Sequence, residues 1–136
     1  MSQTLCQQAL LIFADDKTKV SSFYQCVLGL DVIESTSSYE LLSGHGCEIF
    51  VHSASVSESS SGGDESKPAP RIDTSLKPIF TVFDLEGIRD VAVHTGGFLL
   101  PPEQAWKYRN FLVLDGWDPE GNVVQFRQKL KATLES

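Results

Sequence analysis

The chain has 136 residues, of which 41% are hydrophobic and 21% are charged, which fits one soluble domain with a hydrophobic core. Its 18 acidic residues outnumber its 11 lysines and arginines, and the formal net charge is −7. The basic residues form no cluster that could neutralise phosphates, so nucleic acid is excluded as an expected partner. A membrane is excluded as well, because no apolar run approaches the roughly 18 residues that a spanning helix needs.

The N-terminal sequence MSQTLCQQALLIF carries no basic region ahead of its short apolar run, which argues against a signal peptide. The three cysteines, Cys6, Cys26 and Cys47, are odd in number and lack CxxC spacing. We interpret them as small buried hydrophobic residues in a reducing compartment. A cytoplasmic protein is therefore expected.

The first half of the chain predicts one strand, one helix and three further strands. Residues 5–14 are apolar enough for a buried strand. Asp15 or Asp16 can cap the helix that follows, and Gly29 ends it. Short strands separated by Ser and Gly turns are expected at residues 31–35, 39–42 and 47–52.

The second half repeats this order after residues 53–75, whose Ser, Gly and Pro content predicts a flexible connection. A strand is expected at residues 77–83, followed by a helix that Asp84 caps and Gly96-Gly97 ends. Three more strands are expected at residues 98–100, 106–115 and 122–128.

Chance rarely reproduces an entire order of elements, so the repeat outweighs any single motif. We expect an α+β fold in which residues 1–136 form a single domain. Its two βαβββ modules would span residues 5–52 and 76–129, with the connection 53–75 between them.

Three stretches of the sequence resemble the glyoxalase/bleomycin-resistance/dioxygenase superfamily, which has the vicinal oxygen chelate fold. They are FADDKTKVSSFYQCVLGLDV, HTGGFLLPPEQAWKYRNF and DPEGNVVQFRQ. The resemblance covers nearly the whole chain outside the connection. It implies that the two modules form a cupped mixed sheet around a central pocket. It also implies a homodimer, because this family pairs its modules side by side, within or between chains.

Metal-dependent members of the superfamily carry one metal ligand on the first strand and one on the last strand of each module. Carried over to this sequence, these positions are Gln8, Glu48, Pro78 and Gln125. Only Glu48 is a strong ligand and Pro78 has no side-chain donor, whereas a catalytic metal needs at least three protein ligands. A shift of one residue in the first strand would replace Gln8 by Ala9. We therefore expect no bound metal and no other cofactor.

The remaining candidates for catalysis are weaker. His52 shares the strand parity of Glu48 but lies four residues away, a distance of about 13 Å. His45 falls in the turn before that strand, and His94 on the second helix. The pair of Glu40 and Glu48 could suggest acid–base chemistry, but the polar neighbours of Glu40 favour a solvated face.

The side chains expected to line the cup suit a small molecule. An acid among aromatic rings favours a flat or cationic ligand through stacking and cation–π contacts. By the two-residue alternation of strands, the candidate ligand-binding residues are Gln8, Glu48, Phe50, Phe80, Trp106, Tyr108 and Gln125. The alternative interpretation is that the aromatic residues, Phe50 and Phe80 above all, belong to the plain core.

Two classes of function follow. The first is a metal-free protein that sequesters a small molecule, in the manner of the bleomycin-resistance branch and its antibiotic-resistance proteins. The second is an enzyme, a lyase or dioxygenase of the glyoxalase type with a remodelled metal site. The missing third ligand favours the first class. The expected partners are a small-molecule ligand and a second copy of the chain.

Overall fold

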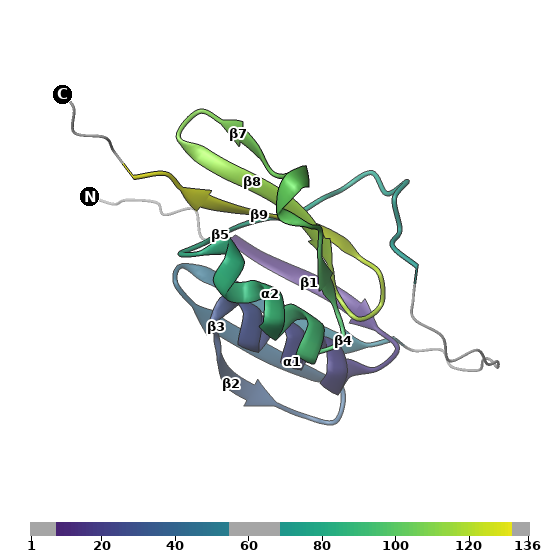
Figure 1. The fold of residues 1–136 in the computed structure, drawn as a ribbon. Helices are drawn as coiled ribbons and strands as arrows, with labels where there is room; N and C mark the ends of the chain where they lie inside the picture. Colours follow the sequence, from purple (N-terminus) through teal and green to yellow (C-terminus); the bar gives the residue numbers. More distant parts are fainter. Residues whose placement is uncertain (1–7, 55–68, 132–136) are drawn as a thin grey trace, which may run out of the picture. The chain divides into compact units, whose positions relative to one another are not determined.

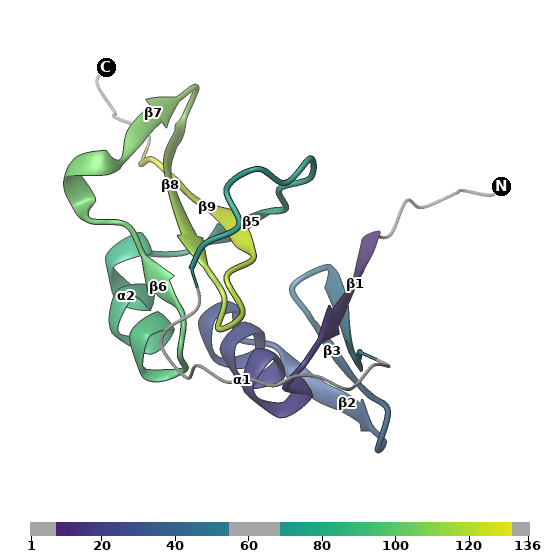
Figure 2. The same cartoon turned by 90° about the vertical axis from the view of Figure 1, so that its right-hand side faces the viewer.

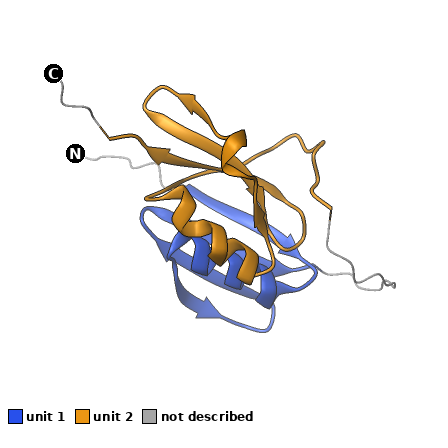
Figure 3. Ribbon diagram, in the orientation of Figure 1, with its two compact units in different colours: residues 1–66 blue, residues 67–136 orange. Residues whose placement is uncertain are grey.

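The computed structural model describes residues 8–54 and 69–131, while residues 1–7, 55–68 and 132–136 lie outside the described parts. The chain divides into two compact units, residues 1–66 and 67–136, which Figure 3 colours separately. Each unit contains a mixed sheet and a helix in the order strand, helix, strands. The α+β fold built from two βαβββ modules is therefore confirmed.

The sheet of the first unit has the strand order β1-β4-β3-β2, in which β1 and β4 are parallel and the other pairs are antiparallel. Figures 1 and 2 show α1 along one face of this sheet. The elements are β1 (Gln8–Ala14), α1 (Lys17–Leu28), β2 (Asp31–Ser35), β3 (Tyr39–Gly44) and β4 (Cys47–Ser53).

The start of α1 decides between the two predicted caps. Asp16 is the capping residue, and its side chain accepts a hydrogen bond of 3.1 Å from the backbone N–H of Lys19. At the other end Gly29 adopts φ 69°, the left-handed conformation expected of a glycine that ends a helix. The helix therefore begins one residue later than a cap at Asp15 would place it.

The core of the first unit lies between α1 and one face of the sheet. The strands contribute Leu42, Ile49 and Val51, each fully buried, and the helix contributes Val20 and Phe23. One polar contact crosses this layer, because the Ser21 hydroxyl donates to the Glu40 carboxylate at 2.6 Å. This hydrogen bond is the main cause that lowers the pKa of Glu40.

The sheet of the second unit has the strand order β5-β9-β8-β6, and β7 also pairs with β8. Leu85, Ile88 and Ala92 of α2 are buried, as are Leu114, Val124 and Phe126 of the strands. The elements are β5 (Ile79–Val82), α2 (Leu85–His94), β6 (Phe98–Leu99), a short 3-10 turn (Pro102–Gln104), β7 (Trp106–Tyr108), β8 (Phe111–Trp117) and β9 (Val123–Lys129).

The single strand predicted at residues 106–115 is wrong, because the structure has a hairpin there. Strands β7 and β8 pair in antiparallel fashion, with Tyr108 opposite Phe111. The turn between them uses Arg109 at φ 55°, a conformation that side chains other than glycine adopt rarely. Arg109-Asn110 lacks the glycine of a typical two-residue turn, so no strong turn signal marks this break.

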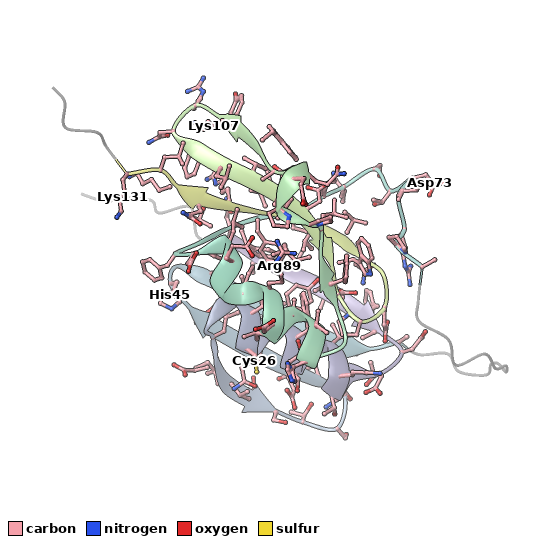
Figure 4. The ribbon with its side chains drawn as sticks, in the orientation of Figure 1. Cys26, His45, Asp73, Arg89, Lys107 and Lys131 are labelled. Carbon is pink, nitrogen blue, oxygen red and sulfur yellow. The ribbon has the colours of Figure 1, made fainter. Side chains whose placement is uncertain are left out.

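Arg89 of α2, labelled in Figure 4, fixes the helix to the chain that leaves β6. Its Nη1 donates to the carbonyl oxygens of Leu99 at 3.1 Å and Leu100 at 2.8 Å. Its Nε and Nη2 bind the Glu86 carboxylate at 2.8 Å and 2.7 Å. The guanidinium lowers the pKa of Glu86, and the hydrogen bond to Glu86 raises the pKa of Arg89. Arg89 is thus a structural residue.

The predicted flexible connection, residues 53–75, lies outside the described residues at 55–68. Ser53 is the last residue of β4. On the far side, the backbone N–H of Arg71 donates to the carbonyl of Gly121 at 2.7 Å, and its Nε donates to the carbonyl of Glu120 at 3.3 Å. The residues after 68 are therefore anchored on the turn before β9. In the described parts of the chain, no helix is long and apolar enough to cross a membrane.

We predict that Gly121→Ala destabilises the protein more than Gly46→Ala. Both glycines have positive φ, 85° and 77°, so both variants strain the backbone, by about 1–2 kcal/mol. A Cβ on Gly121 would also collide with the carbonyl of Ala69, whereas nothing lies within 4 Å of one on Gly46. Urea denaturation should show a loss at Gly121 that exceeds the loss at Gly46 by about 1 kcal/mol or more. Equal losses would contradict the anchoring of residues 69–71.

Candidate functional site

The face of the first sheet that points away from α1 carries most of the acidic groups of that sheet. Paired residues of neighbouring strands lie on the same face, so the register gives its composition. We call it the acidic face. Its three rows are Asp31, Ser43, Glu48 and Ala9, then Glu34, Leu41, Phe50 and Leu11, and finally Tyr39, His52 and Phe13.

The charge of the acidic face is one-sided. Asp31, Glu34 and Glu48 are all exposed carboxylates. Among the described residues of its three rows there is no lysine or arginine. Three like charges on one surface create a negative potential that attracts cations.

Aromatic rings gather at one end of this face. His52 stacks on Tyr39 with ring centroids 6.0 Å apart and an interplanar angle of 13°. Phe13 lies 5.6 Å from His52, and Phe50 lies 6.2 Å from Tyr39. From the sequence we predicted only Phe50 as a site residue in this cluster. We weighed His52 as a metal ligand and not as an aromatic ring that stacks. The signal that was missed is the strand parity that Phe13, Tyr39 and His52 share.

The Tyr39 hydroxyl is hydrogen-bonded to the Glu34 side chain on the same face. This hydrogen bond raises the pKa of Tyr39, and burial and the negative charge of Glu34 add to the effect. Tyr39 lies in β3 and Glu34 in β2, so this hydrogen bond crosses between the two strands.

Gln8 does not lie on the acidic face, which corrects the prediction that it points the same way as Glu48. Gln8 pairs with Cys47, and Ala9 pairs with Glu48. The reason is the helix cap: because Asp16 and not Asp15 caps α1, the position counted back from it moves by one residue. A shift of one residue moves a strand side chain to the other face.

The corresponding face of the second sheet carries basic and aromatic residues, and we call it the basic face. Gln125 lies on it, as predicted from the turn that precedes β9. The rows of this face are Trp117 with Val123 and Phe98, Asp115 with Gln125 and Ile79, Trp106 with Val113, Arg127 and Thr81, and Tyr108 with Phe111 and Lys129.

Gln125 belongs to a polar cluster that the sequence did not reveal. Its amide Nε2 donates to Asp115 Oδ1 at 3.1 Å, and Lys77 Nζ lies 2.8 Å from Asp115 Oδ2. The acid is thus shared by an amide and an ammonium group. Only the register of β8 against β9, which places Asp115 opposite Gln125, could have shown this cluster.

Phe80 is the second predicted site residue that lies on a different face of its strand from the one we expected. It pairs with Phe126, and the two ring centroids are 6.3 Å apart. Phe126 is fully buried on the side of α2, so Phe80 lies on the helix side and not beside Gln125. Ile79 occupies the position next to Gln125 instead. The prediction that Phe80 lines the cup is therefore wrong, and the plain-core interpretation describes it better.

Trp106 and Tyr108 lie on the basic face in β7, on the same face as Gln125. Their exposed fractions are 44% and 57%, so both rings are available to a ligand. Arg109 lies over the Tyr108 ring, with its Cζ 5.6 Å from the centroid. The structure thus confirms where these two rings point, while their role in binding stays a prediction.

The side chains present do not fit the metal that this type of fold can hold. The registers place Ala9 beside Glu48 and Ile79 beside Gln125, and neither Ala9 nor Ile79 has a donor atom. Two of the four ligand positions therefore supply only apolar side chains, below the three ligands of a catalytic metal site. Among the described residues, no group of three His, Cys, Asp or Glu side chains is arranged to hold a metal ion.

Similar solved structures establish the fold. No family model and no curated protein matches the chain. A glyoxalase/bleomycin resistance protein/dioxygenase family enzyme from Burkholderia phytofirmans PsJN is 21% identical, with a TM-score of 0.65 over 90% of this chain and 97% of that one. The fosfomycin resistance protein FosX from Mesorhizobium loti is 10% identical, with a TM-score of 0.59 over 98% and 96%. TioX from Micromonospora sp. ML1 is 14% identical, with a TM-score of 0.60 over 92% and 99%.

These similarities, which span nearly the full length of both chains, show that the protein has the fold of the glyoxalase/bleomycin-resistance/dioxygenase superfamily. The fold that the sequence resemblance implied is thereby confirmed. A fold of this kind hosts several chemistries, so function must come from the side chains on its faces.

We predict that Glu34→Gln lowers the pKa of Tyr39 toward the ordinary tyrosine value of about 10. The carboxylate accepts a strong hydrogen bond from the protonated phenol and opposes the phenolate by its charge. The neutral amide oxygen of glutamine accepts a weaker hydrogen bond and carries no charge, so both effects are reduced. Ultraviolet titration, with Tyr39→Phe to assign the signal, measures the change. Asp31→Asn is the matched control on the same face. A shift equal in both variants would mean that general charge, and not the hydrogen bond, sets this pKa.

Proposed function

We propose that the protein is a metal-free binding protein that sequesters a flat, cationic small molecule on the acidic face. The observation that carries this proposal is the composition of that face. It combines three carboxylates with the rings of Phe13, Tyr39, Phe50 and His52, and has no lysine or arginine in its described rows. This combination suits a ring that bears a positive charge, because aromatic faces and carboxylates both attract cations.

Glu48 is the best-placed anion for such a ligand. Its row neighbours Ala9 and Ser43 are small, so they leave space around the carboxylate. The next row along the strands contains Leu11, Phe50 and Leu41, which form an apolar surface. A flat ring can cover this surface while its cationic nitrogen faces Glu48. The ring would be held by burial of apolar area, and the charge by a charge-assisted contact.

Several further observations support a binding function. Trp106 and Tyr108 are exposed rings on the basic face, where we propose that they stack on a ligand separate from the cation. Gln125 keeps its predicted role as a polar contact on that face. A fosfomycin resistance protein is among the proteins of similar fold, which supports a link to small toxic molecules. The central pocket and the homodimer stay predictions.

We predict that Glu48→Gln weakens binding of protonated 4-aminoquinoline, a flat cation whose N–H groups can donate to a carboxylate, by about tenfold or more. This corresponds to about 1.5–3 kcal/mol, the usual contribution of a hydrogen bond to a charged group. Titration calorimetry at low ionic strength measures the affinity. Asp73→Asn is the matched control, since it removes the same charge from an exposed residue of the other unit.

Because Glu48 is exposed, its replacement should leave the melting temperature of the unliganded protein nearly unchanged. A variant that melts lower but binds the cation as tightly as the parent would refute the proposal. An equal loss of affinity in Asp73→Asn would show that net charge attracts the cation without a site.

We also predict that the protein purified without chelator contains no stoichiometric nickel, zinc or iron. The physical reason is the pair of apolar side chains, Ala9 and Ile79, at two of the four ligand positions. Elemental analysis by plasma mass spectrometry provides the measurement, and Glu48→Gln is the control. One equivalent of metal that disappears in that variant would favour the enzyme of the glyoxalase type instead.

A further inference from the structure

Arg127 on the basic face is held in place by two contacts that leave the end of its side chain unused. Its Nε donates to the hydroxyl of Thr81 at 3.0 Å. Its guanidinium carbon lies 4.2 Å from the centroid of the Phe111 ring, which is a cation–π contact. In the parts of the chain that the structure describes, no acceptor is bound to its terminal nitrogens Nη1 and Nη2.

Such an arginine is prepared to bind an anion. The two terminal nitrogens of a guanidinium form a planar fork that matches the two oxygens of a carboxylate. Thr81 and Phe111 already restrict the side chain, so little conformational freedom remains to be lost on binding. A guanidinium held in this way differs from a mobile surface arginine, which must be ordered by its ligand.

The surroundings of Arg127 favour a negative ligand. Lys129 follows on the same face of β9. Among the described residues of the rows of the basic face, Asp115 is the one carboxylate, and it is already bound by Lys77 at 2.8 Å and by Gln125 at 3.1 Å. Asp115 therefore does not compete for the fork of Arg127.

The same row supplies a surface for a ring. Arg127 pairs with Val113, and Val113 pairs with Trp106, so the arginine and the indole are two strands apart, about 10 Å. Tyr108 lies in the neighbouring row, opposite Phe111. Both rings are largely exposed, at 44% for Trp106 and 57% for Tyr108. A carboxylate on a fused pair of rings has the length to reach from the fork to these side chains.

We propose that Arg127, with Trp106 and Tyr108, forms a binding site for a flat aromatic carboxylate. The carboxylate accepts two hydrogen bonds from Nη1 and Nη2, and the ring stacks on the exposed aromatic side chains of β7. This site is independent of the cation site proposed above, because it has the opposite charge and lies on the other sheet. One of the two sites can therefore fail without the other.

The test uses the full chain and 2-naphthoate as the probe, with binding followed by the chemical shifts of the arginine Nε–Hε groups and by calorimetry. We expect 2-naphthoate to shift the Arg127 signal. Its neutral isostere 2-naphthamide should bind about tenfold more weakly, because it lacks the charge that the fork recognises. Inorganic phosphate should also bind more weakly than 2-naphthoate, because it has no ring to stack on β7.

Arg127→Lys is the decisive variant, since it keeps the positive charge but loses the planar fork. It should weaken 2-naphthoate at least about fivefold, and Trp106→Leu should weaken 2-naphthoate but not phosphate. Lys107→Gln is the matched control, which removes one positive charge from the other face of β7 and should change the affinity by less than about twofold. Circular dichroism establishes that each variant is folded.

Two results would overturn the proposal. One is equal affinity for 2-naphthoate and 2-naphthamide, and the other is an Arg127→Lys variant that binds 2-naphthoate as tightly as the parent. Equal binding of phosphate and 2-naphthoate would refute the aromatic part of the site. Glu48→Gln should leave the affinity for 2-naphthoate unchanged, so this experiment separates failure of the anion site from failure of the cation site.

Discussion

Burial of one face of each sheet against its helix is the constraint on which the other features of this protein depend. Because side chains alternate along a strand, the choice of the residues that meet the helix also decides which residues stand on the opposite face. In the first unit, Leu42, Ile49 and Val51 fill the helix side. Glu48 and Phe50 alternate with them along β4 and are thereby placed on the acidic face.

The two units use this constraint to present different chemistry on the same scaffold. The first unit places carboxylates beside rings, and the second places guanidinium and ammonium groups beside rings. In both, a ring has a polar partner: Tyr39 is hydrogen-bonded to Glu34, and Phe111 contacts the guanidinium of Arg127. A negative net charge for the whole chain conceals this difference, since charge acts through its local distribution.

The order of the elements, the helix ends and most strand positions could be predicted from the sequence, because periodicity and turn residues are local signals. The predicted capping of α2 by Asp84 was wrong, since the Asp84 side chain makes no capping hydrogen bond and the Leu85 N–H donates to Gln128 Oε1 at 2.8 Å. Which side chains stand on which face of a sheet could not be predicted with the same success. Counting from Asp15 instead of Asp16 moved Gln8 to the wrong side, and the same shift of one residue near Pro78 misplaced Phe80. Glu48 and Gln125, which the resemblance places at matching positions of the last strands of the two modules, both lie on the faces that point away from the helices. The hairpin at Arg109 carried no strong turn signal.

The pairing of Gln125 with Asp115 shows why the residue at this position matters for the type of chemistry. The family resemblance of the sequence implies a metal ligand, such as a glutamate, at the position of Gln125. Here Asp115 lies directly opposite on β8 and accepts a hydrogen bond of 3.1 Å from the Gln125 amide. A glutamate at this position would bring two carboxylates together, and like charges in opposed positions destabilise a sheet. The amide instead donates to the acid while Lys77 neutralises it. The charges and hydrogen bonds of the cluster are thus matched without a metal. Gln125 acts in it as a hydrogen-bond donor and not as a metal ligand.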